Sequence, residues 1–163
     1  MLPLKSRLAQ DRKHDEGFTL IELMVVVMII AVLLAIAIPT FLGTQNKAKD
    51  RSAQSSLRNT VTAAKTIYTD GTSYVTATPA ALLAVEPALT FAATDVASSK
   101  ATDVSVNAAT ATTFYGAALS SSGECYYVKD DINAGTSYSK TAVAADCTGT
   151  KAALAAFTAT GWS

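Results

Sequence analysis

Residues 17–46 read GFTLIELMVVVMIIAVLLAIAIPTFLGTQN and decide the fold of this chain of 163 residues. Sixteen consecutive apolar residues run from Leu23 to Ile38, and no charged residue occurs between Leu23 and Asn46. As an α-helix, these 24 residues would span about 36 Å, against about 30 Å for the hydrocarbon core of a bilayer. A buried core helix would need protein on every side, which so short a chain does not supply. The stretch therefore predicts a membrane-spanning helix.

The composition of the whole chain narrows the function classes. Hydrophobic residues make up 50% of the chain and charged residues 16%, below the roughly 25% of soluble domains, which agrees with a membrane segment. Thirteen basic residues balance thirteen acidic ones, so the net charge does not point to nucleic acid. His14 is the single histidine, and Cys125 and Cys147 are the two cysteines. We therefore expect no cofactor, no metal site and no enzymatic activity.

Residues 1–17, MLPLKSRLAQDRKHDEG, form a polar leader ahead of the apolar run. A secretory signal peptide is the main alternative for such an N-terminus. Its apolar part would be about 7–15 residues long and would be followed by a cleavage site. Here the run is longer and continues into a polar, helix-compatible stretch at residues 44–69. We therefore interpret the apolar run as a segment that stays in the protein.

The stretch after the apolar run has the pattern of an amphipathic helix. Apolar side chains recur there at spacings of 4, 4, 3 and 4 residues, which places them on one helix face. These residues are Ala53, Leu57, Val61, Ala64 and Tyr68. We predict one long helix over residues 18–69, in which residues 18–42 span the membrane and residues 43–69 continue outside it.

Two features predict where this helix bends and where it ends. Pro39 removes one helical hydrogen bond and clashes with the preceding turn, so we expect a bend at Pro39 and Gly43. Asp70-Gly71 supplies a stop, because glycine takes the left-handed conformation that ends many helices. The helix should therefore end at Thr69.

Residues 70–163 are expected to form a globular head with few large apolar side chains. Of these 94 residues, 23 are alanine and 25 are serine or threonine. Four short strand-like runs are separated by turn formers and predict an antiparallel meander. The predicted strands are Thr102–Val106, Thr112–Leu119, Cys125–Asp130 and Ser137–Val143. The fold class is therefore α+β, with the amphipathic helix packed on a small antiparallel sheet.

Other parts of the head are less regular in pattern. Residues 72–100 are expected to be a loop region with one short helix, and Lys151–Ala156 a last short helix or irregular. Side chains alternate between the two faces of a strand, and the pattern leaves open which set faces the helix. The candidates for the sheet core are Tyr115, Leu119, Tyr126 and Val128.

Two further patterns favour ordinary structural roles. Residues 130–135, DDINAG, are similar to the start of a calcium-binding loop but lack the downstream glutamate, so a simple turn is favoured. Five basic residues at positions 47–65, less the charge of Asp50, give this stretch a local charge of +4, while the charged residues from Asp70 onward sum to −4. A solvated face, or one that pairs with the head, is favoured over nucleic-acid binding, because no aromatic residues are interleaved for stacking. The basic residues are Lys47, Lys49, Arg51, Arg58 and Lys65.

The junction of leader and apolar run carries the most specific motif, Gly17-Phe18-Thr19-Leu20-Ile21-Glu22. With the leader, the apolar helix containing Pro39 and the cysteine pair near the C-terminus, it resembles the type IV prepilins. The resemblance implies that a membrane-embedded prepilin peptidase cuts between Gly17 and Phe18 and methylates the new amine of Phe18. An inner-membrane assembly platform would then draw the subunit from the lipid and stack it, helix on helix, with copies of itself into a filament.

Glu22 is an acid inside an apolar helix, which costs about 2.5–3.5 kcal/mol at the bilayer centre and less near its edge. One interpretation is an interfacial glutamate that reaches the lipid headgroups. The other follows from cleavage, which would create an amine at Phe18, within one helical turn of Glu22. The amine of a neighbouring subunit could pair with this acid, and such a pair would specify axial register more than it adds stability.

The orientation in the membrane is not decided by charge, because basic residues lie on both sides of the apolar run. A disulfide forms outside the reducing cytoplasm, and two cysteines in an exported head predict a Cys125–Cys147 disulfide. The resemblance places the leader inside. We therefore expect a single-pass precursor in the cytoplasmic membrane with its head outside, and later an extracellular filament, the pilus.

Three roles within this family remain open from the sequence. The favoured one is a major pilin, whose long surface filaments serve adhesion, motility or DNA uptake. A major pseudopilin of a type II secretion system is the first alternative, but such subunits often lack the cysteine pair and carry a calcium site. A minor pilin acting as an adhesin is the second, but minor pilins often lack the acid that is present here as Glu22.

Overall fold

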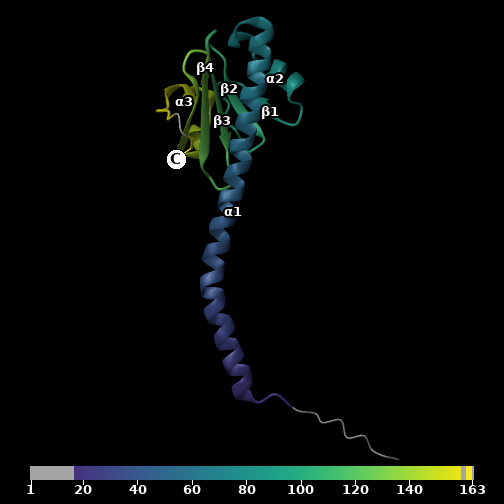
Figure 1. The fold of residues 1–163 in the computed structure, drawn as a ribbon, viewed down its shortest axis with the longest axis vertical. Coiled ribbons are helices and arrows are strands. Elements are labelled where there is room, and N and C mark those ends of the chain that lie inside the picture. The colour runs from purple at the N-terminus through teal and green to yellow at the C-terminus, as the bar shows by residue number, and fades with distance from the viewer. Residues whose placement is uncertain (1–16, 159–160, 163) are drawn as a thin grey trace, which may run out of the picture. The chain divides into compact units, whose positions relative to one another are not determined.

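The computed structural model describes residues 17–158 and 161–162, which form a long helix, a five-stranded sheet and short helices (Figure 1). Residues 1–16, which include His14 and nearly all of the predicted leader, lie outside the described residues. The chain divides into two compact units, Met1–Thr40 and Phe41–Ser163. In chain order the elements are α1 (Leu20–Gly71), η1 (Tyr74–Thr76), α2 (Pro79–Val85), β1 (Thr90–Ala92), β2 (Asp103–Asn107), β3 (Thr113–Leu119), β4 (Cys125–Asp131), β5 (Gly135–Thr141), η2 (Ala144–Asp146) and α3 (Gly149–Leu154).

Helix α1 confirms the predicted long helix, with both ends shifted by two residues. The helix assignment continues through Pro39 and Gly43 without interruption. One turn near the proline is supported by a side chain, because the hydroxyl of Thr40 donates to the carbonyl of Ile36 at 3.0 Å. A bend at Pro39 and Gly43 stays a prediction.

The end of α1 is made by a different residue from the one predicted. Thr72 takes the left-handed conformation, with φ of 54°, and its N–H donates to the carbonyl of Tyr68 at 2.6 Å. Gly71 does not have a positive φ, so the prediction of a left-handed Gly71 is wrong. What Gly71 provides is space, because a Cβ at this position would lie 3.3 Å from the hydroxyl oxygen of Thr76.

The sheet has the strand order β1-β2-β3-β4-β5. Strands β2 to β5 pair with their sequence neighbours in antiparallel fashion and confirm the predicted meander, with boundaries shifted by one or two residues. Strand β1 was not predicted, and it pairs with β2 in parallel, starting at Thr90 opposite Asp103. The sheet is therefore not wholly antiparallel. A three-residue strand is too short to show an alternating pattern in the sequence.

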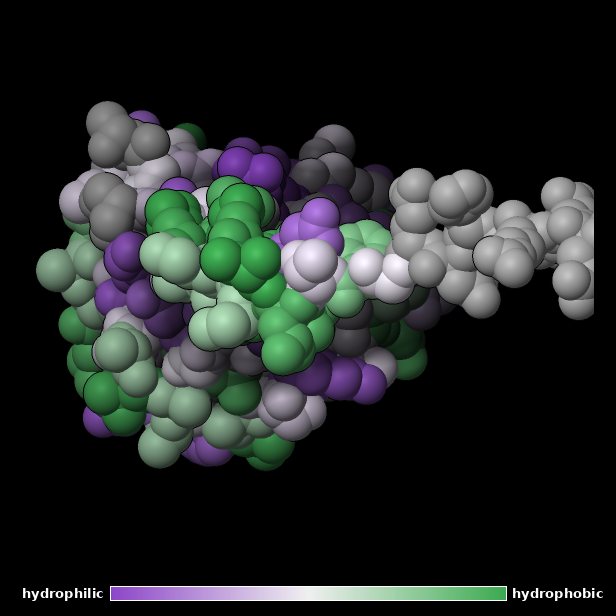
Figure 2. Space-filling model, turned by 90° about the horizontal axis from the view of Figure 1, so that it is seen from below, coloured by the Kyte–Doolittle hydropathy of each residue, from purple (hydrophilic) through white to green (hydrophobic). Residues whose placement is uncertain are grey.

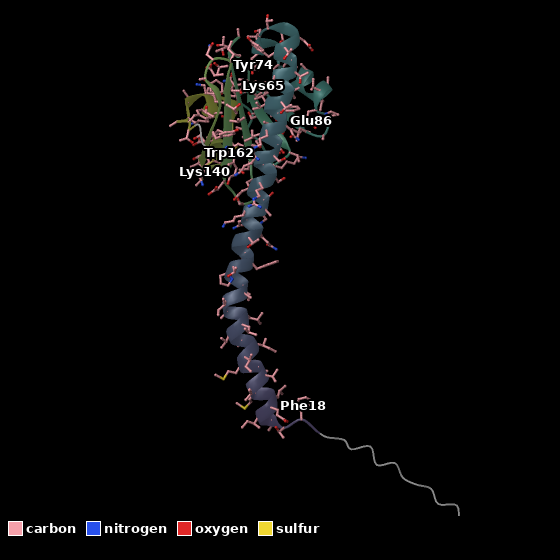
Figure 3. The ribbon with its side chains drawn as sticks, in the orientation of Figure 1. Phe18, Lys65, Tyr74, Glu86, Lys140 and Trp162 are labelled. Atoms are coloured by element: carbon pink, nitrogen blue, oxygen red, sulfur yellow. A yellow bond between two sulfur atoms is a disulfide. The ribbon has the colours of Figure 1, made fainter. Side chains whose placement is uncertain are left out.

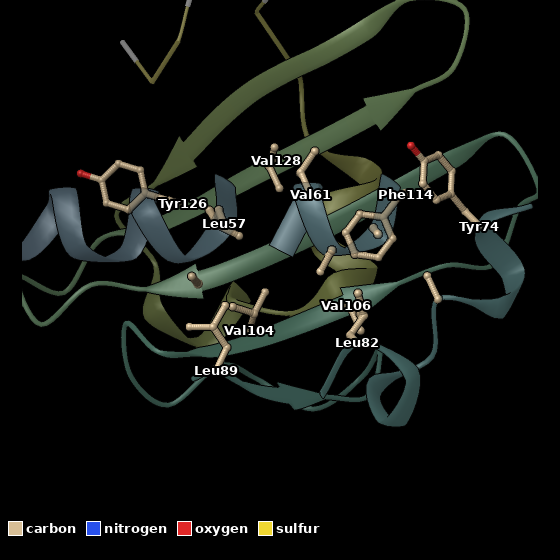
Figure 4. Close-up of a cluster of buried hydrophobic side chains, with 14 of the residues drawn as sticks. Leu57, Val61, Tyr74, Leu82, Leu89, Val104, Val106, Phe114, Tyr126 and Val128 are labelled. Atoms are coloured by element: carbon tan, nitrogen blue, oxygen red, sulfur yellow. The ribbon is translucent and has the colours of Figure 1, made fainter. Parts of the chain in front are cut away.

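The face of the sheet toward α1 forms the larger core (Figure 4). On β4, Tyr126 and Val128 point to this face, and on β3 Gly116 lies opposite Val128. A Cβ on Gly116 would lie 3.2 Å from side-chain atoms of both Leu57 and Val128, so the glycine permits the close approach of α1 to the sheet. The predicted apolar face of α1 is confirmed, since Ala53, Leu57, Val61 and Ala64 are buried and Tyr68 is partly buried against the same core.

The opposite face of the sheet is covered by residues from the C-terminal part of the chain. Cys125 and Tyr127 on β4 are buried there with Cys147 and with Ala152 of α3. Tyr115 and Leu119 of β3 also lie on this side and are partly buried. The four predicted core residues therefore lie on both faces of the sheet: Tyr126 and Val128 face α1, and Tyr115 and Leu119 face the opposite side. Side chains alternate between the two faces along each strand, which accounts for this division.

A disulfide joins Cys125 to Cys147, as predicted, and links β4 to the turn before α3. The two cysteines are 22 residues apart in the sequence. In the chain-entropy model, a disulfide that closes a loop of this length stabilises the fold by about 3–3.5 kcal/mol. The Cys125→Ala/Cys147→Ala variant should therefore lose about 3 kcal/mol in a urea unfolding experiment. Adding reductant should destabilise the wild type to the same extent and leave the variant unchanged. Alkylation of both cysteines in denatured, unreduced protein would contradict the bridge.

A buried carboxylate connects α1, η1 and β5. Asp130, at 2% exposure, accepts hydrogen bonds from the Lys65 ammonium at 2.9 Å and the Thr136 hydroxyl at 2.6 Å. Its second oxygen accepts from the hydroxyl of Tyr74. Figure 3 labels Lys65 and Tyr74, two of these three partners, in the head. Burial and this hydrogen bond raise the pKa of Tyr74 above its usual value. Asp130 thereby fixes the end of α1 against the sheet.

Asp130→Ala should cost about 2–3 kcal/mol of unfolding free energy, because the buried hydroxyl of Tyr74 then loses its acceptor. Lys65→Ala should cost less, about 1 kcal/mol, because the Asp130 carboxylate then loses a counter-charge that is itself 52% exposed but keeps the hydrogen bonds from the hydroxyls of Tyr74 and Thr136. Urea unfolding of both variants and of Tyr74→Phe measures the difference. Equal losses for Asp130→Ala and Lys65→Ala would show that the ion pair, and not the buried hydroxyl, dominates.

Candidate functional site

The predicted cleavage site lies just ahead of α1. Gly17 and Phe18 are outside any helix or strand, and both are exposed, Phe18 to 86%. A Cβ added to Gly17 would meet no described atom within 4 Å. Packing within the described chain therefore does not require a glycine at this position, and a requirement for one must come from a molecule that binds here.

Glu22 closes the first turn of α1 through a capping box. The carbonyl of Thr19 accepts the N–H of Leu23 at 3.2 Å, which makes Thr19 the N-cap of the helix. Oε2 of Glu22 accepts the backbone N–H and the hydroxyl of Thr19, both at 2.8 Å. The N–H of Glu22 in turn donates to the Thr19 hydroxyl oxygen at 3.3 Å. This reciprocal pattern stabilises a helix start.

The capping role of Glu22 was missed in the sequence, although its signal was present. The residues Thr19-Leu20-Ile21-Glu22 have the T-x-x-E spacing of a capping box ahead of an apolar run. Only one carboxylate oxygen takes part, because both bonds from Thr19 end on Oε2. Within the part of the chain that the structure describes, Oε1 accepts no hydrogen bond and Glu22 forms no ion pair. One oxygen therefore remains for a donor from another molecule.

The first half of α1 presents a large apolar surface. Every residue from 17 to 49 is exposed, and Figure 2 shows hydrophobic residues clustered where the described chain begins. Among the described residues, α1 is the helix long and apolar enough to cross a membrane, and its most apolar part is not buried. Such a surface in water is strongly unfavourable, so lipid or other protein must cover it.

The remaining predicted site residues lie apart from this motif. Gly43 is exposed, and a Cβ there would also meet no described atom within 4 Å. The calcium-like loop is the turn between β4 and β5, in which Oδ1 of Asp131 accepts the N–H groups of Asn133 and Ala134. These two bonds lower the pKa of Asp131. Across residues 17–158 and 161–162, no three His, Cys, Asp or Glu side chains are grouped to hold a metal ion.

A capped, exposed apolar helix behind a Gly-Phe junction, followed by an α+β head, defines a pilin-like class of protein. Residues 12–38 match the family model described as the prokaryotic N-terminal methylation motif. This match covers the end of the leader, the predicted cleavage site, Glu22 and the apolar run. The resemblance to type IV pilins is confirmed for this part of the chain.

Three curated proteins share sequence with the chain. The type IV major pilin protein PilA of Myxococcus xanthus is 41% identical over 68 residues, which cover 42% of this chain and 31% of that protein. The type IV wide pilus major component PilA4 of Thermus thermophilus is 37% identical over 45% of this chain and 55% of its own length. The competence protein ComGC of Halalkalibacterium halodurans is 38% identical over 28% of this chain and 44% of its own length.

The chain thus matches about a third to about half of the length of these relatives. The similarity is to proteins that are named as pilus or competence components, two of them as the major component of a type IV pilus. No solved structure matches the chain.

Proposed function

We propose that this chain is the structural subunit, the major pilin, of a type IV pilus. The observation that carries the proposal is the exposed apolar half of α1 directly behind the methylation motif. Lipid can cover this surface before assembly, and the same surface of other copies can cover it afterwards. Two relatives named as major pilus components support the choice of a major subunit.

Processing by a prepilin peptidase between Gly17 and Phe18 is the first step of this function. The junction is accessible, because both residues are exposed and precede the first helical turn. A peptidase needs an extended, open backbone, and the missing side chain of Gly17 leaves that backbone uncovered. The match to the N-terminal methylation motif supports methylation of the new Phe18 amine by the same enzyme.

Assembly depends on Glu22 in this proposal. Its Oε2 is held by Thr19 within the same copy, which orients the carboxylate. Its Oε1 is then available to the Phe18 amine of a neighbouring copy. Between packed apolar helices, water is scarce, and a charge pair that forms at one axial stagger fixes the register of the subunits.

The head lies outside the cytoplasm in this proposal, and the leader lies inside. The Cys125–Cys147 disulfide supports this orientation, since structural disulfides persist in oxidising compartments. An inner-membrane assembly platform would extract the processed subunit, so the protein is first a single-pass membrane precursor and then part of an extracellular filament.

Electron microscopy of sheared surface material tests the proposed function. A strain that expresses the chain should release filaments, a deletion strain should release none, and expression from a plasmid should restore them. Mass spectrometry of the restored filaments should identify this chain as the most abundant protein. Filaments of normal number in the deletion strain would overturn the proposal of a major pilin.

A further inference from the structure

Three cations follow directly on the uncharged run of α1 and form no ion pair with any residue that the structure describes. Lys47, Lys49 and Arg51 are all exposed, and within the described residues none of them forms an ion pair. The acid between them, Asp50, is turned to the head, where its Oδ1 accepts the hydroxyls of Ser120, at 2.7 Å, and Ser122. The local acid is therefore taken by the head and does not form an ion pair with these three cations.

The other two cations of this helix are held by the chain itself. The guanidinium of Arg58 lies over the ring of Trp162, 5.1 Å from its centroid. The ammonium of Lys65 pairs with Asp130 at 2.9 Å. Of these five basic residues, two therefore contact the head, and three have no ion-pair partner among residues 17–158 and 161–162.

The three free cations point to opposite sides of the helix. At about 100° per residue, Lys47 and Arg51 project within about 40° of each other, while Lys49 projects about 200° from Lys47. A protein that docks on one face of α1 would contact two of them at most. A layer that surrounds the helix would contact all three, and a lipid headgroup layer is such a surrounding.

The position of these three cations along the helix axis also fits a lipid headgroup layer. At about 1.5 Å per residue, they lie within about 6 Å of one another along the axis and begin where the 24 uncharged residues end. Those residues cover about 36 Å, and a bilayer has a hydrocarbon core of about 30 Å with polar layers of about 5–7 Å on each side. The three cations therefore fall at the level of the lipid phosphates.

We propose that Lys47, Lys49 and Arg51 bind the phosphate groups of anionic phospholipids while the chain is inserted in the membrane. This inference rests on the membrane insertion included in the proposed function. A lipid with net negative charge is preferred over a zwitterionic one, because the latter brings its own cation to the same layer. The three contacts hold the subunit at a defined depth before assembly.

Spin-labelled lipids measure this preference on the full chain in phosphatidylcholine vesicles. Electron paramagnetic resonance should give a relative association of phosphatidylglycerol over phosphatidylcholine of at least about threefold, falling in about 1 M salt. Lys47→Gln/Arg51→Gln should remove at least about half of the preference. The control Lys129→Gln/Lys151→Gln removes the same charge from residues that pair with Asp131 and Asp146. It should leave the preference unchanged, and basic residues of the leader contribute equally to every variant.

Single variants separate a lipid layer from a protein partner. Lys49→Gln should lower the preference as much as Lys47→Gln, although the two side chains project to opposite sides. An effect of Lys47→Gln alone, or equal effects of the control and the test variant, would overturn the proposal. Unchanged lipid preference together with lost filaments would assign these cations to a second copy of the chain instead. A chain that fails to float with the vesicles would overturn both the lipid site and membrane insertion, whereas a retained chain without preference overturns the lipid site alone.

Discussion

Gly17→Leu is expected to block removal of the leader and to abolish filaments. A leucine side chain would cover the backbone that the peptidase must reach, and the uncut chain would lack the free amine at Phe18. The variant should still fold, because no described atom lies within 4 Å of a Cβ at this position. Immunoblots of membrane fractions should show the precursor alone.

Gly43→Leu is the matched control for this variant. Its Cβ also meets no described atom within 4 Å, but it lies inside α1, far along the chain from the cleavage site. We expect normal processing of Gly43→Leu. Full processing of Gly17→Leu, or a processing defect of equal size in Gly43→Leu, would contradict the assignment of Gly17 to the cleavage site.

Glu22→Gln is expected to abolish filaments while leaving the start of α1 intact. Glutamine fits the same capping box as glutamate, so the bonds to Thr19 are retained and only the charge is lost. The Phe18 ammonium of the next copy would then be buried without a counter-charge. Removing one partner of such a pair costs about 3–5 kcal/mol, which weakens each subunit addition by more than about 100-fold.

Thr19→Ala provides the reciprocal control, because it removes the cap and keeps the charge. Loss of an N-cap costs about 0.5–2 kcal/mol, so filaments should form in reduced number. Both variants should be inserted and cut normally, which is scored in the membrane fraction before filaments are counted. Normal filaments with Glu22→Gln and a greater loss with Thr19→Ala would show that Glu22 acts as a helix cap and not in assembly.

The parts of the fold that follow local patterns were predictable from the sequence. The uncharged run and the spacing from Ala53 to Tyr68 predicted α1 and its buried face, and both are confirmed. Four strands were predicted within two residues, because turn formers bound each of them. The disulfide was predictable because the chain has two cysteines, so pairing within the head allowed a single connection.

Features that depend on distant residues coming together were not predictable. Asp130 is bound by Lys65, Tyr74 and Thr136, and no spacing in the sequence connects these positions. Strand β1 has three residues and needs β2 as its partner. The left-handed conformation of Thr72 was not predicted although it is a local feature, because the neighbouring Gly71 adopts this conformation more readily. Gly71 instead leaves space for the side chain of Thr76.

The capping box of Thr19 and Glu22 is a different case, because its signal is local and complete in the sequence. An acid inside an apolar helix also fits pairing with an amine or a place at the lipid interface, so the T-x-x-E spacing alone does not single out capping. The structure shows that one oxygen can cap the helix while the other stays free. The two roles are therefore compatible and separable by Glu22→Gln.

Intact-mass spectrometry of subunits from purified filaments tests the central claim most directly, namely that this chain is cut after Gly17 and assembled. The account predicts a subunit of residues 18–163, one methyl group heavier than its sequence and lighter by two hydrogens for the Cys125–Cys147 disulfide. The unassembled precursor in the membrane should carry residues 1–17 and no methyl group. Filaments whose subunits retain Met1–Gly17, or purified filaments without this chain, would contradict the account.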